Sequence, residues 1–315
     1  MTRDASPPSA TTAAPAWPVM VLAHNEAKRI VACLDSIYAA EPGRRFDIFV
    51  MANGCTDDTE KIVNEYAETH EGVKLVSIAM ADRCNAWNVF IHLTAPAHVP
   101  RRDLYFFMDG DCRAYPGSFT ELAKGLADNP EANAAGAPPM CGRDMGRDAR
   151  ALLKNRRIVA NLYALSGRFV QDLQAKGVRL PLGLDAADDG VIGALAKWNL
   201  DPRNEWEDAR IVPCPKAGFL FDSLSPTNWK EWKQYWRRLV LYGRRQYDNQ
   251  LLGARLKREG IGGMPERIAD LYSDADKLSL RWQGIYTITN WVALRRVRKH
   301  AKSATRRAAP PSPRA

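Results

Sequence analysis

Long apolar runs, a secretion signal and paired cysteines are all missing from this sequence. No stretch approaches the ~18 consecutive apolar residues that a membrane span needs. The segment "MTRDASPPSATTAAPAWP" lacks the apolar core of a secretion signal, and its Pro, Ala, Ser and Thr content predicts a disordered leader over residues 1–16. The six cysteines are scattered without a C-x-x-C pair, which argues against a disulfide framework or a zinc site. We therefore expect a cytoplasmic protein with free thiols.

Acidic residues are missing from residue 295 onward. The whole chain has a formal net charge of +9, and eight lysines and arginines lie in this last segment. Without them the rest of the chain is close to neutral. A folded surface that binds nucleic acid would carry the basic residues itself, so we expect no nucleic acid partner. We predict a basic, disordered tail over residues 301–315.

Strand and helix patterns alternate in the first half of the chain. Short apolar strand patterns occupy residues 17–23, 45–52, 73–79 and 103–109, and helical patterns occupy residues 25–40, 56–70, 85–94 and 116–127. This alternation predicts an α/β fold with a mostly parallel sheet and helices on both faces.

The second half is less regular. We predict a long helical stretch over residues 147–177, a loop with three aspartates leading into a helix within 180–199, strand-like residues over 209–221, and a Trp- and Arg-rich helical region from 227 onward.

Polar residues stand directly after three of the predicted strands. They are His24, Asn25 and Glu26 after the first strand, Asn53, Gly54 and Cys55 after the second, and Asp109 and Asp111 after the fourth. In sheets of this kind ligands bind outside the carboxyl ends of the strands. Two carboxylates separated by one glycine repel each other unless a cation lies between them or solvent surrounds them. We favour a ligand site at this edge over a solvated acidic turn.

Five motifs occur in a familiar order, namely "VLAHNEAKRI", "NGCTDDT", "RCNAWN", "MDGD" and "DAADDGVIGAL". Together they resemble a family 2 glycosyltransferase of the GT-A fold over residues 17 to 250. The resemblance implies a Rossmann-like catalytic domain over 17–225, with a nucleotide-binding half over 17–115 and an acceptor half over 116–225, and then a C-terminal helical region over 226–300. It also implies inverting transfer of a sugar from a nucleotide diphosphate sugar to a hydroxyl acceptor, which is a saccharide or a lipid.

The resemblance assigns the carboxylate pair to a metal. Asp109 and Asp111 match the D-x-D motif of the family, which binds a divalent ion beside the diphosphate of the donor. Mn²⁺ and Mg²⁺ both prefer oxygen ligands. Asp111 is the candidate for direct metal contact, and Asp109 is the candidate nearer the ribose.

Further residues match positions that line the nucleotide pocket in the family. They are Ala23, Asn25 and Glu26 at the end of the first strand, Asn53 after the second, and Arg83 before the third helix. Asn25 and Glu26 also suit a helix start, and Arg83 also suits a solvated surface arginine. Ala52 replaces the first aspartate of the motif that reads uracil, so the base is left open.

The family's general base comes from an acidic pair before a helix in the second half. Here that pair is Asp188 and Asp189, with Asp189 the candidate base and Asp185 a third acid nearby. The alternative is a helix N-terminus that carries acids because of its dipole.

The segment "KQYWRRLVLYGRRQY" partly matches a Q-x-x-R-W motif near the diphosphate, which makes Arg237 and Arg238 candidates for donor binding. The alternative there is an aromatic stripe with a solvated basic face.

The sequence leaves two alternative functions and one membrane contact open. A sugar nucleotidyltransferase usually has a Gly-rich loop after the first strand, whereas "AHNEAKRI" has no glycine. A non-catalytic basic binding protein leaves the aspartate motifs unexplained. Residues 279–303 place aromatic and aliphatic side chains beside a basic run, which suits peripheral contact with an anionic membrane at its inner face. The alternative for that segment is a helix that packs on the domain.

Overall fold

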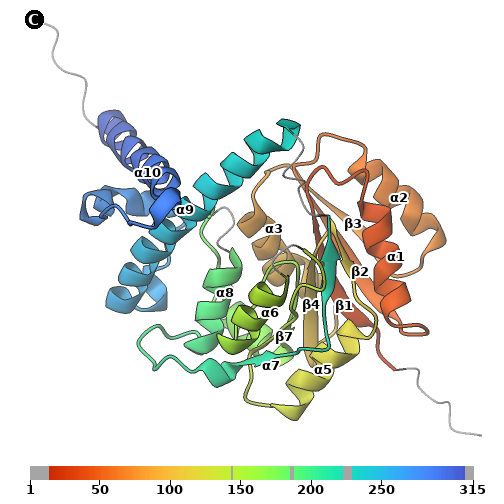
Figure 1. The fold of residues 1–315 in the computed structure, drawn as a ribbon. Helices are drawn as coiled ribbons and strands as arrows, with labels where there is room; N and C mark the ends of the chain where they lie inside the picture. Colours follow the sequence, from red (N-terminus) through yellow and green to blue (C-terminus); the bar gives the residue numbers. More distant parts are fainter. Residues whose placement is uncertain (1–13, 143–144, 185–187, 223–228, 309–315) are drawn as a thin grey trace, which may run out of the picture.

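A seven-stranded sheet forms the centre of the computed structural model, which describes residues 14–142, 145–184, 188–222 and 229–308. The strands lie in the order β3-β2-β1-β4-β7-β6-β8 (Figure 1). Their bounds are β1 Trp17–Ala23, β2 Phe46–Asn53, β3 Val73–Ile78, β4 Leu104–Asp109, β6 Ala134–Gly136, β7 Leu162–Ser166 and β8 Ile211–Pro213. The first four strands are parallel, as the alternation of strands and helices predicts. A separate two-stranded ribbon pairs β5 Cys112–Ala114 with β9 Phe219–Phe221.

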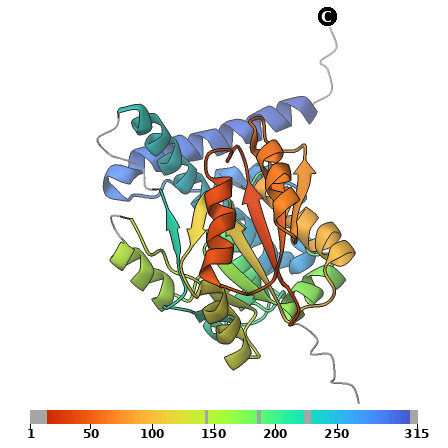
Figure 2. The ribbon, with the colours of Figure 1, turned by 90° about the vertical axis from the view of Figure 1, so that its right-hand side faces the viewer.

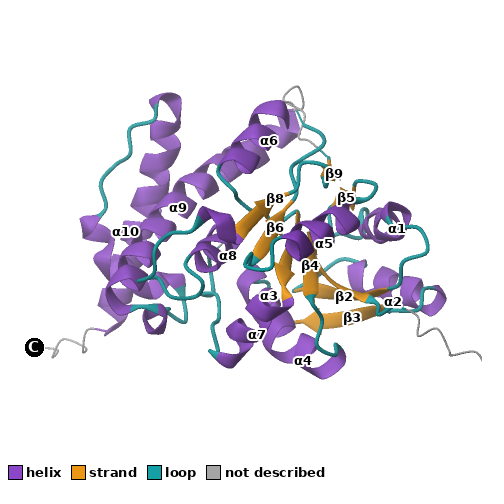
Figure 3. Cartoon of the chain, turned by 90° about the horizontal axis from the view of Figure 1, so that it is seen from below, coloured by secondary structure: helices purple, strands orange, loops and turns teal. Residues whose placement is uncertain are grey.

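Successive residues of each strand enter two different apolar cores. Val19, Ile48 and Phe106 belong to one core, and their chain neighbours Met20, Phe49 and Phe107 belong to the other. This alternation follows from the two-residue repeat of a strand, so both faces of the sheet need a cover. Helices on opposite sides of the sheet provide it (Figure 3).

The helices divide between the two faces. The first core is covered by α1 Ile30–Ala40, α2 Thr59–Thr69 and α5 Ser118–Asp128, and Figure 2 looks onto this face past α1. The second is covered by α3 Arg83–Val89, η1 Phe90–Thr94, α4 Ala95–His98, α7 Gly167–Ala175 and α8 Asp188–Lys197. The remaining elements before the C-terminal region are α6 Met145–Lys154 and the short η2 Asp208–Arg210.

The prediction of one helical stretch over residues 147–177 is wrong in its middle. α6 ends at Lys154, and the chain then forms β7, which pairs antiparallel with both β4 and β6. Every residue of β7 is buried. A short apolar run such as "LYALS" has the same sequence pattern in a buried strand as in a buried helix, and only its neighbours in the sheet decide between them.

The C-terminal region is helical, as predicted. It consists of α9 Trp229–Glu259, three short 3-10 segments (η3 Ile261–Gly263, η4 Ile268–Lys277 and η5 Gly284–Tyr286) and α10 Thr287–Ala308. Side chains of α9 such as Tyr247 and Leu251 share a core with the sheet. The region therefore packs on the α/β body and does not form a separate core.

The boundary predicted for the basic tail is too early, because α10 continues from residue 301 to Ala308. Leu294 and Val297 are buried where α10 packs on α9. This packing stabilises the helical turns of α10 that precede residue 301. Alanine, lysine and arginine then propagate a helix that has already formed. Residues 1–13, most of the predicted leader, and 309–315 lie outside the described part of the chain. Within that part, no helix is long and apolar enough to cross a membrane.

Candidate active site

A pocket of about 320 Å³ opens at the carboxyl ends of β1, β2 and β4. It is lined by Leu22, His24, Glu26, Asn53, Ala81, Arg83, Asp109, Gly110 and Asp111. The polar residues that follow three separate strands therefore meet at one place, as the parallel arrangement predicts. We call this pocket the strand-end pocket.

The turn between the two aspartates requires a glycine. The backbone N–H of Gly110 donates to the carbonyl of Leu22 over 2.8 Å, which ties the end of β4 to β1. A Cβ at this position would lie 3.0 Å from the same oxygen, which is tighter than nine in ten real contacts of a Cβ. Glycine thus lets β4 turn beside β1 with a carboxylate on either side of the turn.

Arg83 lies between two carboxylates from distant parts of the chain. Its guanidinium donates to Asp109 over 2.9 Å and to Asp188 over 3.3 Å. Burial raises the pKa of Asp109 to about 6; the charge of Arg83 opposes this shift, and the charges of Asp111 and Asp188 add to it. Arg83 is therefore an ion-paired residue of the site and not a solvated surface arginine.

Asp111 has a different environment from Asp109. One of its oxygens accepts a weak hydrogen bond from the Cys112 thiol, at 3.3 Å, and no ion pair to it is found among the described residues. Its carboxylate lines the strand-end pocket and has oxygen lone pairs free for a cation, which suits Mn²⁺ or Mg²⁺. No three His, Cys, Asp or Glu side chains cluster as a metal site within the described ranges. A cation at Asp111 would thus take further oxygens from its ligand or from water.

Asn25 holds a neighbouring loop. It adopts a left-handed backbone conformation with φ 57°, and its side-chain oxygen accepts from the backbone N–H of Thr56 over 2.7 Å. Because α1 begins only at Ile30, Asn25 does not cap that helix. Asn25 is not among the residues that line the strand-end pocket, so it positions the loop after β2.

Glu26 does face the strand-end pocket, where it pairs with Arg29 over 2.6 Å. Burial is the largest effect on Glu26 and raises its pKa, and the Arg29 charge opposes that rise. Ala23 is fully buried at the end of β1 and does not line the pocket. Asn53 lines the pocket, but its side-chain oxygen accepts from the backbone N–H of Asp82 over 2.9 Å. The amide of Asn53 thus joins the end of β2 to the start of α3.

Asp188 and Asp189 open α8 and point to different partners. Asp188 contacts Arg83 beside the strand-end pocket, whereas Asp189 pairs with Arg245 of α9 over 2.6 Å. Burial raises the pKa of Asp189, and the Arg245 charge opposes the rise. The third acid of the motif, Asp185, lies outside the described residues.

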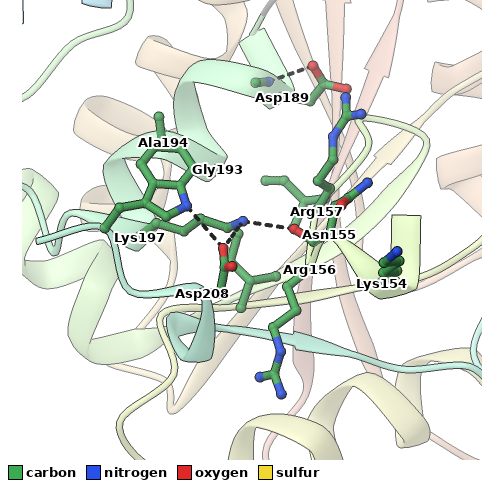
Figure 4. Close-up of a pocket in the computed structure, with 13 residues that line it drawn as sticks. Lys154, Asn155, Arg156, Arg157, Asp189, Gly193, Ala194, Lys197 and Asp208 are labelled. Carbon is green, nitrogen blue, oxygen red and sulfur yellow. Dashed lines mark hydrogen bonds and ion pairs between the residues drawn. The ribbon is translucent and has the colours of Figure 1, made fainter. Parts of the chain in front are cut away.

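Asp189 also lines a second pocket, of about 350 Å³, which we call the basic pocket (Figure 4). It is lined by Lys154, Asn155, Arg156, Arg157, Ile158, Asp189, Gly190, Gly193, Ala194, Lys197, Trp206, Asp208 and Ile211. Lys197 is buried in its wall and donates to Asp208 over 2.6 Å. Our sequence interpretation missed this pocket, because it placed Arg156 and Arg157 inside a continuous helix.

Arg237 and Arg238 stand apart from both pockets. They lie on α9 with exposed side chains, and neither lines the strand-end pocket. The described part of the chain thus brings together Glu26, Asn53, Arg83, Asp109 and Asp111, with Asp188 in contact through Arg83.

The chain belongs to glycosyl transferase family 2, whose model matches residues 19–177. It is thus a glycosyltransferase of the GT-A fold. A comparison with curated proteins finds no match.

Among solved structures, mannosyltransferase PcManGT from Pyrobaculum calidifontis, in complex with GDP-Man and Mn²⁺, is 19% identical with a TM-score of 0.53, over 95% of this chain and 77% of that one. TarS from S. aureus is 13% identical with a TM-score of 0.49, over 93% and 92% of the two chains. Glucosyl-3-phosphoglycerate synthase from Mycobacterium tuberculosis is 17% identical with a TM-score of 0.47, over 68% and 74%. At 19% identity, the likeness to PcManGT concerns the fold alone.

Replacing Arg83 with glutamine should lower the free energy of unfolding by about 1–3 kcal/mol at pH 8, because two carboxylates lose their partner. Asp109 has a folded-state pKa near 6 with Arg83 present, and loss of Arg83 raises it further. The carboxylate is protonated below that pKa, so the deficit should shrink at pH 5. Urea unfolding at both pH values measures it. Lys61→Gln, which breaks the exposed pair with Glu65, is the control and should change little. If Arg83→Gln lowers the free energy of unfolding equally at both pH values, the assignment of Asp109 as the partner of Arg83 is wrong.

Proposed function

We propose that the protein transfers a sugar from a nucleotide diphosphate sugar to a hydroxyl acceptor with inversion at the anomeric carbon. The observation that carries this proposal is the cluster at the strand-end pocket. There Asp109 and Asp111 line one pocket with Arg83, and Arg83 joins Asp109 to Asp188 at the start of α8. Family membership favours this function over a sugar nucleotidyltransferase or a basic binding protein.

The reaction needs charge stabilisation on the donor side. The bond between the anomeric carbon and a phosphate oxygen breaks, and the diphosphate leaves with its electron pair. A Mn²⁺ or Mg²⁺ ion, when bound, neutralises that leaving group. In this chain Asp111 would hold the ion. Asp109, held by Arg83, lies beside Asp111 and is the candidate contact to the ribose.

The reaction also needs a base on the acceptor side. As the acceptor oxygen forms its bond to the anomeric carbon, its proton passes to a carboxylate. We assign this role to Asp189. Burial raises its pKa toward the range that a base requires, and its side chain lines an open pocket. Asp188 is the second candidate because it contacts Arg83 directly.

Asp111→Asn should weaken metal-dependent nucleotide binding, because the substitution removes the carboxylate charge that is free for a cation. Calorimetry with UDP and GDP, with and without Mn²⁺, measures the effect. Asp128→Asn, an exposed aspartate at the end of α5, is the matched control and should bind like the wild type. If metal-dependent nucleotide binding is unchanged in Asp111→Asn, the assignment of the metal to Asp111 is wrong.

Asp189→Asn should lower turnover by a factor on the order of 10² or more and leave donor binding nearly unchanged. Product release from a panel of nucleotide sugars measures turnover, and NMR of the product reports the anomeric configuration. Loss of activity in Asp188→Asn alone would move the base to Asp188. A product with retained configuration would overturn the single-displacement reaction.

We propose in addition that the C-terminal region contacts an anionic membrane, which would place a cytoplasmic enzyme at the inner face beside a lipid-linked acceptor. Large apolar side chains are exposed here, with Trp282 83% and Ile288 60% accessible. The exposed Trp291 lies under the guanidinium of Arg295, 5.4 Å from ring centre to carbon. Aromatic side chains beside basic ones suit a membrane interface, and each basic residue there contributes about 1 kcal/mol.

Sedimentation with liposomes tests the membrane contact. The wild type should bind vesicles that contain anionic lipid at low salt, and binding should fall at high salt. Arg295→Glu combined with Lys299→Glu should abolish binding, because both side chains are exposed on α10. Lys61→Glu combined with Lys124→Glu makes the same charge change on α2 and α5 and is the control. If both double variants lose vesicle binding equally, the net charge of the protein and not the position of the residues on α10 explains the binding.

A further inference from the structure

The start of α8 carries two consecutive carboxylates, one directed to each of the two pockets. Asp188 contacts Arg83 beside the strand-end pocket, and Asp189 lines the basic pocket. If the donor occupies the strand-end pocket, as proposed above, the space beyond Asp189 is where the attacking hydroxyl would lie. We infer that the basic pocket binds the acceptor, and that this acceptor carries an anionic group, a phosphate or a carboxylate, in addition to its hydroxyl. The inference rests on the proposed function.

The charge of the basic pocket supports an anionic ligand. Its two acids are already neutralised, Asp189 by Arg245 and Asp208 by Lys197. Three further cations, Lys154, Arg156 and Arg157, line the pocket, and their side chains make no hydrogen bond or ion pair with another described residue. Cations gathered without a partner repel each other, and an anion in the pocket would relieve that repulsion.

Arg157 is the cation best placed to orient a ligand beside Asp189. Figure 4 shows its side chain reaching toward Asp189, whereas Arg156 extends to the opposite side of the pocket. Burial raises the pKa of Asp189, and the charge of Arg157 opposes that rise, which agrees with this direction. A guanidinium offers two parallel donors that match a phosphate or a carboxylate. An anion bound there would hold the rest of the acceptor next to Asp189.

The backbone that presents these arginines is in an unusual conformation. Arg156 has φ 45°, in the left-handed region where glycine or asparagine is the usual residue after a helix. Its N–H donates to Leu153 and that of Arg157 to Leu152, so the turn is closed by the end of α6. An arginine kept in this conformation costs stability, and such residues cluster at functional sites.

An exposed aromatic side chain completes the pocket. Trp206 is 52% accessible, and its ring nitrogen donates to Asp208 over 3.0 Å. The hydrogen bond fixes the indole at the pocket wall, where the Lys197 ammonium lies over the ring, 5.0 Å from its centre, and the Trp198 ring packs against it in an edge-on contact. A tryptophan face beside cationic groups suits a ring that has both C–H and hydroxyl groups together with a charge, such as a phosphorylated sugar or a uronate.

Calorimetry with small probes tests the inference. Glucose 6-phosphate, glucuronate, inorganic phosphate and neutral glucose are titrated into the protein with saturating Mn²⁺ and UDP or GDP, which keeps the strand-end pocket filled. We expect at least one anionic probe to bind and glucose not to bind. Arg157→Gln should weaken that binding by about tenfold or more, and Arg157→Lys by less. Arg150→Gln, an exposed arginine on α6 that does not line the pocket, is the control and should bind like the wild type.

Each result has one meaning. Stronger binding of the sugar phosphate than of the uronate assigns the anion to a phosphate, and the reverse assigns it to a carboxylate. Absence of anion binding in the wild type, or equal affinity in Arg157→Gln and the wild type, overturns the inference. Nucleotide binding is measured in the same samples. If UDP, GDP and the other nucleoside diphosphates all fail to bind, the proposed function fails, whereas normal nucleotide binding without anion binding refutes the acceptor class alone.

Discussion

The guanidinium of Arg83, held between Asp109 and Asp188, is the interaction on which the rest of the site depends. Asp109 ends a central strand and Asp188 begins α8, so a single side chain joins the two halves of the protein at the strand-end pocket. Without a cation at this point, the buried carboxylates would repel each other and take up protons. With it, Asp109 stays in place and Asp111 is left free for a ligand.

A second chain of hydrogen bonds runs parallel to this ion pair. Asn53 accepts from the backbone of Asp82, and the Asp82 carboxylate accepts from the N–H of Gly183 over 2.6 Å. Arg244 of α9 then donates to the carbonyl of Gly183 over 3.0 Å. The end of β2, the segment before α8 and helix α9 are therefore linked by hydrogen bonds. The apolar core on this side of the sheet, to which α8 and α9 both contribute, keeps their relative position rigid. A site built across distant segments needs this kind of support.

Three features followed from the sequence: family membership, the parallel arrangement of the first four strands, and the gathering of Glu26, Asn53, Asp109 and Asp111. The last of these followed because strand ends in a parallel sheet share one edge. Local pattern was less informative where a short apolar run was buried. The "LYALS" segment forms β7 only because β4 and β6 lie on either side of it. Its misassignment as helix also concealed the loop that carries Arg156 and Arg157, and with it the basic pocket.

The sequence by itself determined the class of fold, the acidic motifs and the edge of the sheet at which they lie. These depend on residue spacing, which is local, and on the two-residue repeat of strands. Only the tertiary structure decided the partners of each charge. Arg83 could equally have faced solvent, and Asp189 lies far in sequence from Arg245, its partner on α9. Pairing of this kind arises when packed elements bring distant side chains together in a place where water screens their charges less than at the surface.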